Sequence, residues 1–225
     1  MKVLSSRFLL TAAIAASLAS CSSLTGLGDS FSSLAGDDGE DPVAEAVESP
    51  ALNVFTLPPS PAVGQSWTME TSGMKTTTAI VAEVDGQLIV EQEESITPGV
   101  ILAFQVDPKV DMMKVPAVGE KFQSNVTAAW AGAPGKAPKE RKVMEAMVMP
   151  EMTGEAAPAV DMQTGNESVE LGNRTWNAEW AEVSGSKSWS VDGFILRSDY
   201  NGDTMTVLTE WKTDAKPALD WTPAK

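Results

Sequence analysis

The stretch "FILRSDYNGDTMTVLTEW" (Phe194–Trp211) decides the fold class, because it contains the clearest hairpin signal of the chain. The Asn-Gly dipeptide at 201–202 stands between two runs of alternating side chains and is typical of a two-residue type I′ turn. Alternation along the second run places Met205, Val207 and Trp211 on one face of a strand. The stretch therefore predicts two antiparallel strands.

The same pattern extends through much of the chain upstream. Asp85-Gly86 separates two further alternating runs, and the first of them places Ile80, Ala82 and Val84 on one face. Helical periodicity is scarce, so the segments together predict an all-β domain over residues 61–225, built as a single curved antiparallel sheet or half-barrel of about eight to ten strands. The candidate strands are "TTTAIVAEV" (76–84), "QLIVEQE" (87–93), "VILAFQV" (100–106), "KFQSNVTAAW" (121–130), "KVMEAMVM" (142–149) and "RTWNAEWAEV" (174–183).

A calcium-loop pattern overlaps the last hairpin. Asp199, Asn201, Asp203 and Glu210 take positions 1, 3, 5 and 12 of that pattern. Position 6 is Thr204, however, where the sharp turn of a calcium loop needs glycine. We therefore interpret the stretch as a hairpin and predict neither a metal site nor a cofactor.

The amino terminus has the build of a secretory signal, with Lys2 and Arg7 ahead of an apolar run that has no charge. That run is about 11 residues long, whereas a spanning helix needs about 20. The four residues Leu18-Ala19-Ser20-Cys21 resemble the lipobox of bacterial lipoproteins. The resemblance implies a signal peptide over residues 1–20 and acyl chains on Cys21, which anchor the protein to a membrane. Ser22 is not the aspartate that often retains such proteins at the inner membrane, so the expected location is the outer membrane, facing the periplasm.

Residues 21–60 read as a lipidated, flexible acidic tether. From residue 22 to residue 60 there are seven acidic residues and no lysine or arginine, and small polar residues fill much of the rest. Such a composition buries too little apolar surface to fold by itself. The apolar end of this tether, "ALNVFTLPP" (51–59), is expected either to lie against the domain or to form an edge segment.

Composition excludes several classes of function. The chain has 16 Lys+Arg and 31 Asp+Glu, and Lys2 and Arg7 leave with the signal, so the mature side chains sum to −17. Such a charge repels nucleic acid. There is no histidine and only one cysteine, which removes histidine-based catalysis and histidine metal sites. The protein is predicted not to be an enzyme, with a carboxylate-based hydrolase as a remote alternative.

The tryptophans carry the remaining functional prediction. Trp67, Trp176, Trp180 and Trp211 are candidates for an apolar ligand pocket inside the sheet, although core packing is the simpler explanation for them. A lipobox, an acidic tether and a curved sheet with inward tryptophans resemble the periplasmic lipoprotein-carrier fold, whose members bind acyl chains. The predicted function is a non-catalytic envelope lipoprotein whose β-domain binds an apolar ligand or a protein partner. The alternative is a structural or assembly protein that acts through sheet edges and the methionine-rich segment.

Overall fold

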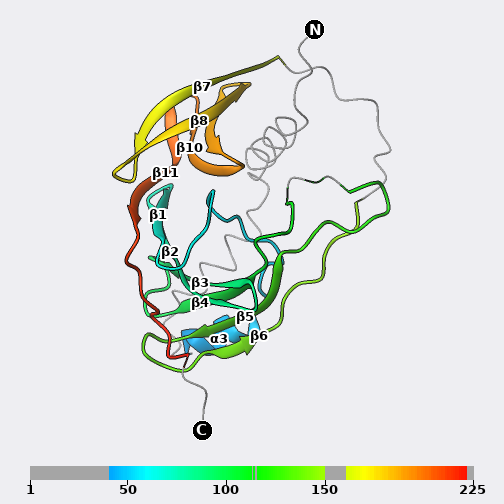
Figure 1. Cartoon of the computed structure of the whole chain (residues 1–225), viewed down its shortest axis with the longest axis vertical. Helices are drawn as coiled ribbons and strands as arrows, with labels where there is room; N and C mark the ends of the chain where they lie inside the picture. The colour runs from blue at the N-terminus through cyan, green and yellow to red at the C-terminus, as the bar shows by residue number, and fades with distance from the viewer. Residues whose placement is uncertain (1–40, 113, 115, 150–160, 222–225) are drawn as a thin grey trace.

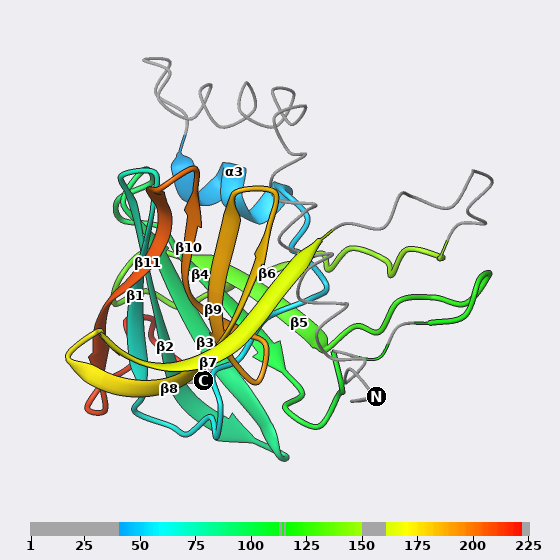
Figure 2. The ribbon, with the colours of Figure 1, turned by 90° about the horizontal axis from the view of Figure 1, so that it is seen from above.

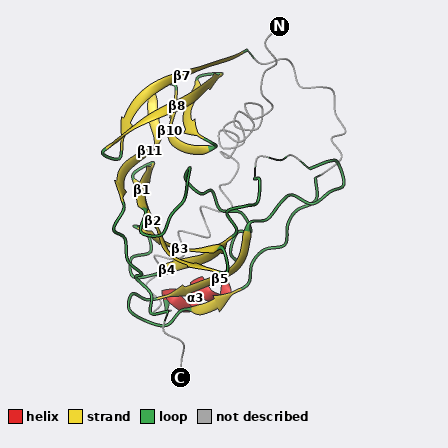
Figure 3. Ribbon diagram, viewed as in Figure 1, coloured by secondary structure: helices red, strands yellow, loops and turns green. Residues whose placement is uncertain are grey.

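The computed structural model describes residues 41–112, 114, 116–149 and 161–221. These residues form one open antiparallel sheet of eleven strands in the order β6-β5-β4-β3-β2-β1-β11-β10-β9-β8-β7, with helix α3 beside it (Figures 1 and 3). The expected all-β curved sheet is confirmed, with eleven strands rather than eight to ten. The elements are α3 (Pro42–Glu48), β1 (Ser66–Thr71), β2 (Met74–Val84), β3 (Gln87–Glu94), β4 (Ile101–Val106), β5 (Val126–Gly132), β6 (Lys139–Arg141), β7 (Met162–Leu171), β8 (Arg174–Val183), β9 (Ser186–Val191), β10 (Phe194–Tyr200) and β11 (Asp203–Lys212).

Two meanders make up this sheet. The first runs outward from β1 to β6, and the second begins at the opposite edge with β7 and returns to β11. The strand β11 then pairs with β1, so the first and last strands of the chain join the meanders at the centre of the sheet. The sheet bends into an open curve in which β7, β8 and β10 lie at one end and β3, β4 and β5 at the other (Figures 1 and 2).

Six of the hairpins turn in only two residues, and both turn residues have positive φ in each of them. This is the geometry of the type I′ turn, which matches the twist of the flanking strands. The Asp-Gly and Asn-Gly turns expected from the sequence are confirmed. The six turns are Ser72-Gly73, Asp85-Gly86, Gly172-Asn173, Ser184-Gly185, Asp192-Gly193 and Asn201-Gly202.

Bulges change which side chains face inward on two strands. In β2 the register slips between Ile80 and Ala82, so both Ile80 and Val81 are buried while Val84 is exposed. The expected common face of Ile80, Ala82 and Val84 is therefore wrong. In β11 the register against β1 slips across Thr209, so Leu208 is buried whereas Met205 is exposed. The expected face of Met205, Val207 and Trp211 is wrong for the same reason, because one extra residue inverts the alternation.

Two segments differ from the expected strands. Residues 142–149 form no strand, and only Val143 and Val148 make isolated bridges, to Ala51 and Lys121. Conversely, β7 is absent from the strands expected from the sequence. Strand β7 pairs with β8 over all ten of its residues.

The domain also begins earlier than residue 61. Within the expected tether, residues 42–48 form α3, which begins with Pro42 and is capped by the Asp41 carboxylate accepting from the Val43 amide at 3.0 Å. Ala51 is buried, and the backbone of Phe55 binds the Asn125 side chain through both its N–H (2.8 Å) and its C=O (2.7 Å). The apolar end of the tether thus lies against the domain, as one of the two alternatives expected. Residues 1–40, with the signal and Cys21, lie outside the described residues.

Apolar side chains pack on both faces of the sheet. The main core lies inside the curve, where residues of both meanders meet. A smaller core on the outer face joins Ile101 and Ala103 of β4 to Leu219 of the C-terminal segment. That segment is held by Glu91, a buried residue of β3 whose carboxylate accepts from the amides of Ala218 (2.6 Å) and Leu219 (3.2 Å) and from Nε1 of Trp221 (2.7 Å).

Candidate functional site

Four aromatic side chains meet on the inner face, where the two meanders join. Trp67 of β1 and Trp211 of β11 are directly opposite in the register, and their rings stack with centroids 6.0 Å apart. Trp176 of β8 meets Trp211 edge-on at 5.2 Å, and Phe194 of β10 meets Trp67 edge-on at 5.7 Å. We call Trp67, Trp176, Phe194 and Trp211 the aromatic cluster. Edge-to-face and offset contacts of this kind stabilise aromatic pairs beyond the area that they bury.

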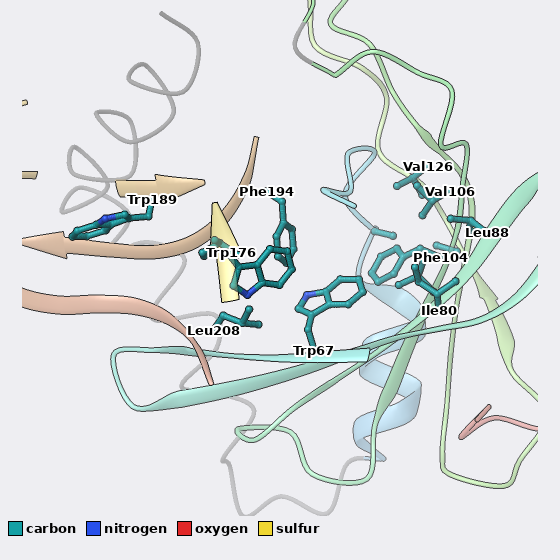
Figure 4. Packing of buried hydrophobic residues seen from close by; sticks show 14 of the residues in the cluster. Trp67, Ile80, Leu88, Phe104, Val106, Val126, Trp176, Trp189, Phe194 and Leu208 are labelled. Carbon is teal, nitrogen blue, oxygen red and sulfur yellow. The ribbon is translucent and has the colours of Figure 1, made fainter. Parts of the chain in front are cut away.

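The aromatic cluster continues into an aliphatic inner face. Figure 4 shows Trp67 between the aromatic side chains of the second meander and Phe104 and Ile80 of the first. Phe55, from the segment before β1, packs against Phe104 with ring centroids 5.2 Å apart. The inner face is therefore apolar across both meanders, from Trp176 to Val126.

Two polar groups, the Leu171 carbonyl and the Arg174 guanidinium, contact the aromatic cluster. The Trp176 indole N–H donates to the Leu171 carbonyl at 3.1 Å, so the buried ring leaves no polar atom unsatisfied. The exposed Arg174 guanidinium lies over Trp176, 4.2 Å from its ring centroid, and 5.2 Å from that of Trp211. An exposed cation is thus held against the aromatic cluster by cation–π attraction.

Trp180 lies apart from the aromatic cluster, in a second group of side chains. Lys187 places its Nζ 4.4 Å from the Trp180 ring centroid and 4.6 Å from that of Trp189. The Trp189 indole N–H donates to the Glu167 carboxylate, which also lies 4.0 Å from Lys187 Nζ. This group combines two indoles with a matched pair of charges.

The hairpin interpretation of the calcium-loop stretch is confirmed. Arg197 donates to both carboxylate oxygens of Asp199, at 2.8 and 2.7 Å, and this bond raises the pKa of the arginine. Asp199 therefore serves as an ion-pair partner within the hairpin. Among the described residues, no three acidic or cysteine side chains gather as metal ligands would.

The structure thus brings together three of the four predicted pocket residues, Trp67, Trp176 and Trp211. Trp180 belongs to the second group. Sequence reasoning missed Phe194 and Arg174, although Phe194 begins the strand before the Asn-Gly turn and Arg174 shares the alternation of Trp176. That these side chains form a ligand site, and not only a core, stays a prediction.

Two further observations concern the described chain and its comparison with other proteins. Within the described ranges, no helix has the length and apolar character needed to span a bilayer. Comparison with protein-family models, with curated proteins and with solved structures finds no match.

Proposed function

We propose that the protein is a lipid-anchored envelope lipoprotein whose β-domain binds an apolar, acyl-chain ligand on its inner face. The observation that carries this proposal is the continuous apolar core on the inner face of an open sheet, with the aromatic cluster at its centre. Ligand sites are concave and mostly apolar, with few polar groups at defined places. Arg174, at the rim, is suited to the anionic head of such a ligand.

A dansyl-labelled fatty acid tests this binding, because tryptophan emission excites the dansyl group only when the two are close. We expect saturable energy transfer in the wild type and a weaker apparent affinity in Trp211→Ala, taken from the titration midpoint because the variant also lacks one tryptophan donor. Trp211 is only partly buried, and circular dichroism shows whether the variant is folded. Trp130→Ala is the matched control, because Trp130 packs on the outer face against Trp221. Equal binding by both variants, or no saturable transfer, would refute the proposal.

The anchor needs a separate experiment. Cells that express the protein are labelled with radioactive palmitate and fractionated, with Cys21→Ser as the comparison. We expect label and membrane association for the wild type and neither for the variant. Label on the variant, or its retention in the membrane pellet, would contradict acylation at Cys21.

A second candidate function, an envelope assembly protein, is favoured by one exposed feature. Residues 117–122 and 144–149 bond to each other through their backbones, as in Phe122 N–H to Met147 O at 2.8 Å. This ribbon exposes the apolar side chains of Met147 (72%) and Val118 (60%), which a protein partner could cover. A photo-crosslinking residue at Met147 should trap a specific envelope partner, whereas one at exposed Tyr200 should not.

A further inference from the structure

The open sheet has two edges, and the residues that the structure describes protect only one of them. The edge strand β6 has three residues and follows Pro138. Its Arg141 donates to the carbonyl of Ser49 at 2.9 Å. The segment before β1 covers the chain just after β6, because Ala51 N–H donates to Lys142 O and Met144 N–H donates to Ala51 O, both at 2.8 Å. Short length, proline and a covering segment are the devices by which proteins block edge pairing.

Within the described part of the chain, the opposite edge has none of these devices. Strand β7 has ten residues, none of them buried, and it contains neither proline nor lysine. It pairs with β8 in an unbroken register, without the bulges seen in five other strand pairs. Among the described residues β8 is the only strand that is hydrogen-bonded to β7, and the turn after β7 lies near β11, so the outward backbone groups have no strand partner ahead of that turn.

The turn between β7 and β8 determines which backbone groups point outward. Leu171 and Arg174 flank a two-residue turn, so they form the hydrogen-bonded pair that closes it. Bonded and non-bonded pairs alternate in an antiparallel ladder. The N–H and C=O groups that point away from β8 therefore belong to Met162, Thr164, Asn166, Ser168 and Glu170.

The inner face of this edge offers an apolar contact. Gly165 stands opposite Trp180, and a Cβ atom at position 165 would lie only 2.7 Å from Cε2 of that indole. The missing side chain lets the Trp180 ring lie over the edge strand. A residue of an added strand that paired beside Gly165 would contact this ring, because neighbouring residues across a sheet share a face.

Charge selects the kind of strand that fits. The whole chain carries a net charge of −15, and of the two ionisable side chains of β7, Glu167 is paired with Lys187 whereas Glu170 is exposed. Two copies of the chain repel each other, whereas a basic strand is attracted. We propose that β7 is a docking edge for an extended basic peptide of a partner protein, which joins the sheet as an added strand. This inference does not rest on the ligand proposed for the inner face.

A fluorescein-labelled decapeptide of alternating valine and lysine is the probe, titrated by fluorescence anisotropy against the full chain. Ser168→Pro removes one outward N–H without touching a bond to β8, so we expect binding to weaken about tenfold. Ser168→Ala keeps that N–H and should bind like the wild type. Circular dichroism and melting curves show whether each variant is folded. If Ser168→Pro does not fold, Asn166→Pro replaces it, because Asn166 also has an N–H that points away from β8.

Hydrogen exchange gives a second measurement, with peptide-dependent protection expected at Thr164, Asn166, Ser168 and Glu170. Four results would overturn the inference: no binding by the wild type, equal binding by Ser168→Pro, equal binding of a valine–glutamate peptide, or a wild-type dimer that Ser168→Pro dissociates. The last result would identify a second copy as the occupant. Unchanged peptide binding by Trp211→Ala separates this site from the inner face.

Discussion

Replacement of Glu91 by glutamine should release the C-terminal segment from the outer face. The carboxylate is 4% exposed and accepts three hydrogen bonds, from two backbone amides and one indole. A glutamine side chain has one acceptor oxygen, and its NH₂ group would face at least one of these donors. A hydrogen bond to a charged group contributes about 1.5–3 kcal/mol, so Glu91→Gln should cost about 2–4 kcal/mol.

Urea unfolding followed by tryptophan fluorescence measures this loss. With a slope of about 1–3 kcal/mol per molar urea, the midpoint should fall by about 1 M or more. Exchange of the Ala218 and Leu219 amides should accelerate in parallel, because the Glu91 carboxylate is their acceptor. Glu93→Gln is the matched control, since Glu93 lies on the same face of β3 but is exposed, and it should stay within about 0.5 kcal/mol of the wild type. Equal midpoints for the two variants would refute the anchoring role of Glu91.

Three further changes test the packing of the domain. Burial raises the pKa of Glu94 above its ordinary value near 4.5, and the positive charge of Arg141 only partly offsets this effect. The native state therefore binds this proton more tightly than the unfolded state does. The resulting contribution to stability is complete below pH 4.5 and is lost as the pH rises through the native pKa. Glu94→Gln should thus raise the melting temperature at pH 7 and change it little at pH 4, and equal shifts at both would contradict this cause. Trp67→Ala should cost about 3–5 kcal/mol in urea unfolding, because the ring is buried in the aromatic cluster. Gly165→Ala should cost about 1–3 kcal/mol because its methyl would meet Trp180, and most of this cost should vanish in a Trp180→Ala background.

Local signals in the sequence predicted the fold class. Alternating runs joined by Asp-Gly and Asn-Gly turns need no knowledge of the distant chain, because both the period and the turn geometry are properties of neighbouring residues. Strand β7 escaped prediction since Gly165 and Glu167 interrupt its inward face, so only Val169 and Leu171 alternate there as apolar residues. The bulges at Val81 and Thr209 escaped because they arise from pairing between strands.

The amino-terminal part of the domain also combines a local signal with a dependence on distant residues. Asp41 and Pro42 form a typical helix start, and that signal was present in the sequence. A helix of seven residues is too short to be stable alone, however, and α3 depends on its packing against β5 and β6. The aromatic cluster could be predicted only in part, because Trp67 and Trp211 come from strands that are neighbours in the sheet but lie far apart in the sequence.

The pairing of β1 with β11 governs the order in which this protein can be completed. The side chains of Thr71 and Thr206 are hydrogen-bonded across 135 positions. During synthesis from the amino end, β1 can therefore pair with β11 only after nearly the whole chain has been made. Such long-range pairing makes folding slow. Until β11 pairs with β1, the aromatic side chains that meet where the two meanders join stay exposed. Exposed apolar surface of this kind promotes aggregation, and chaperones shield it.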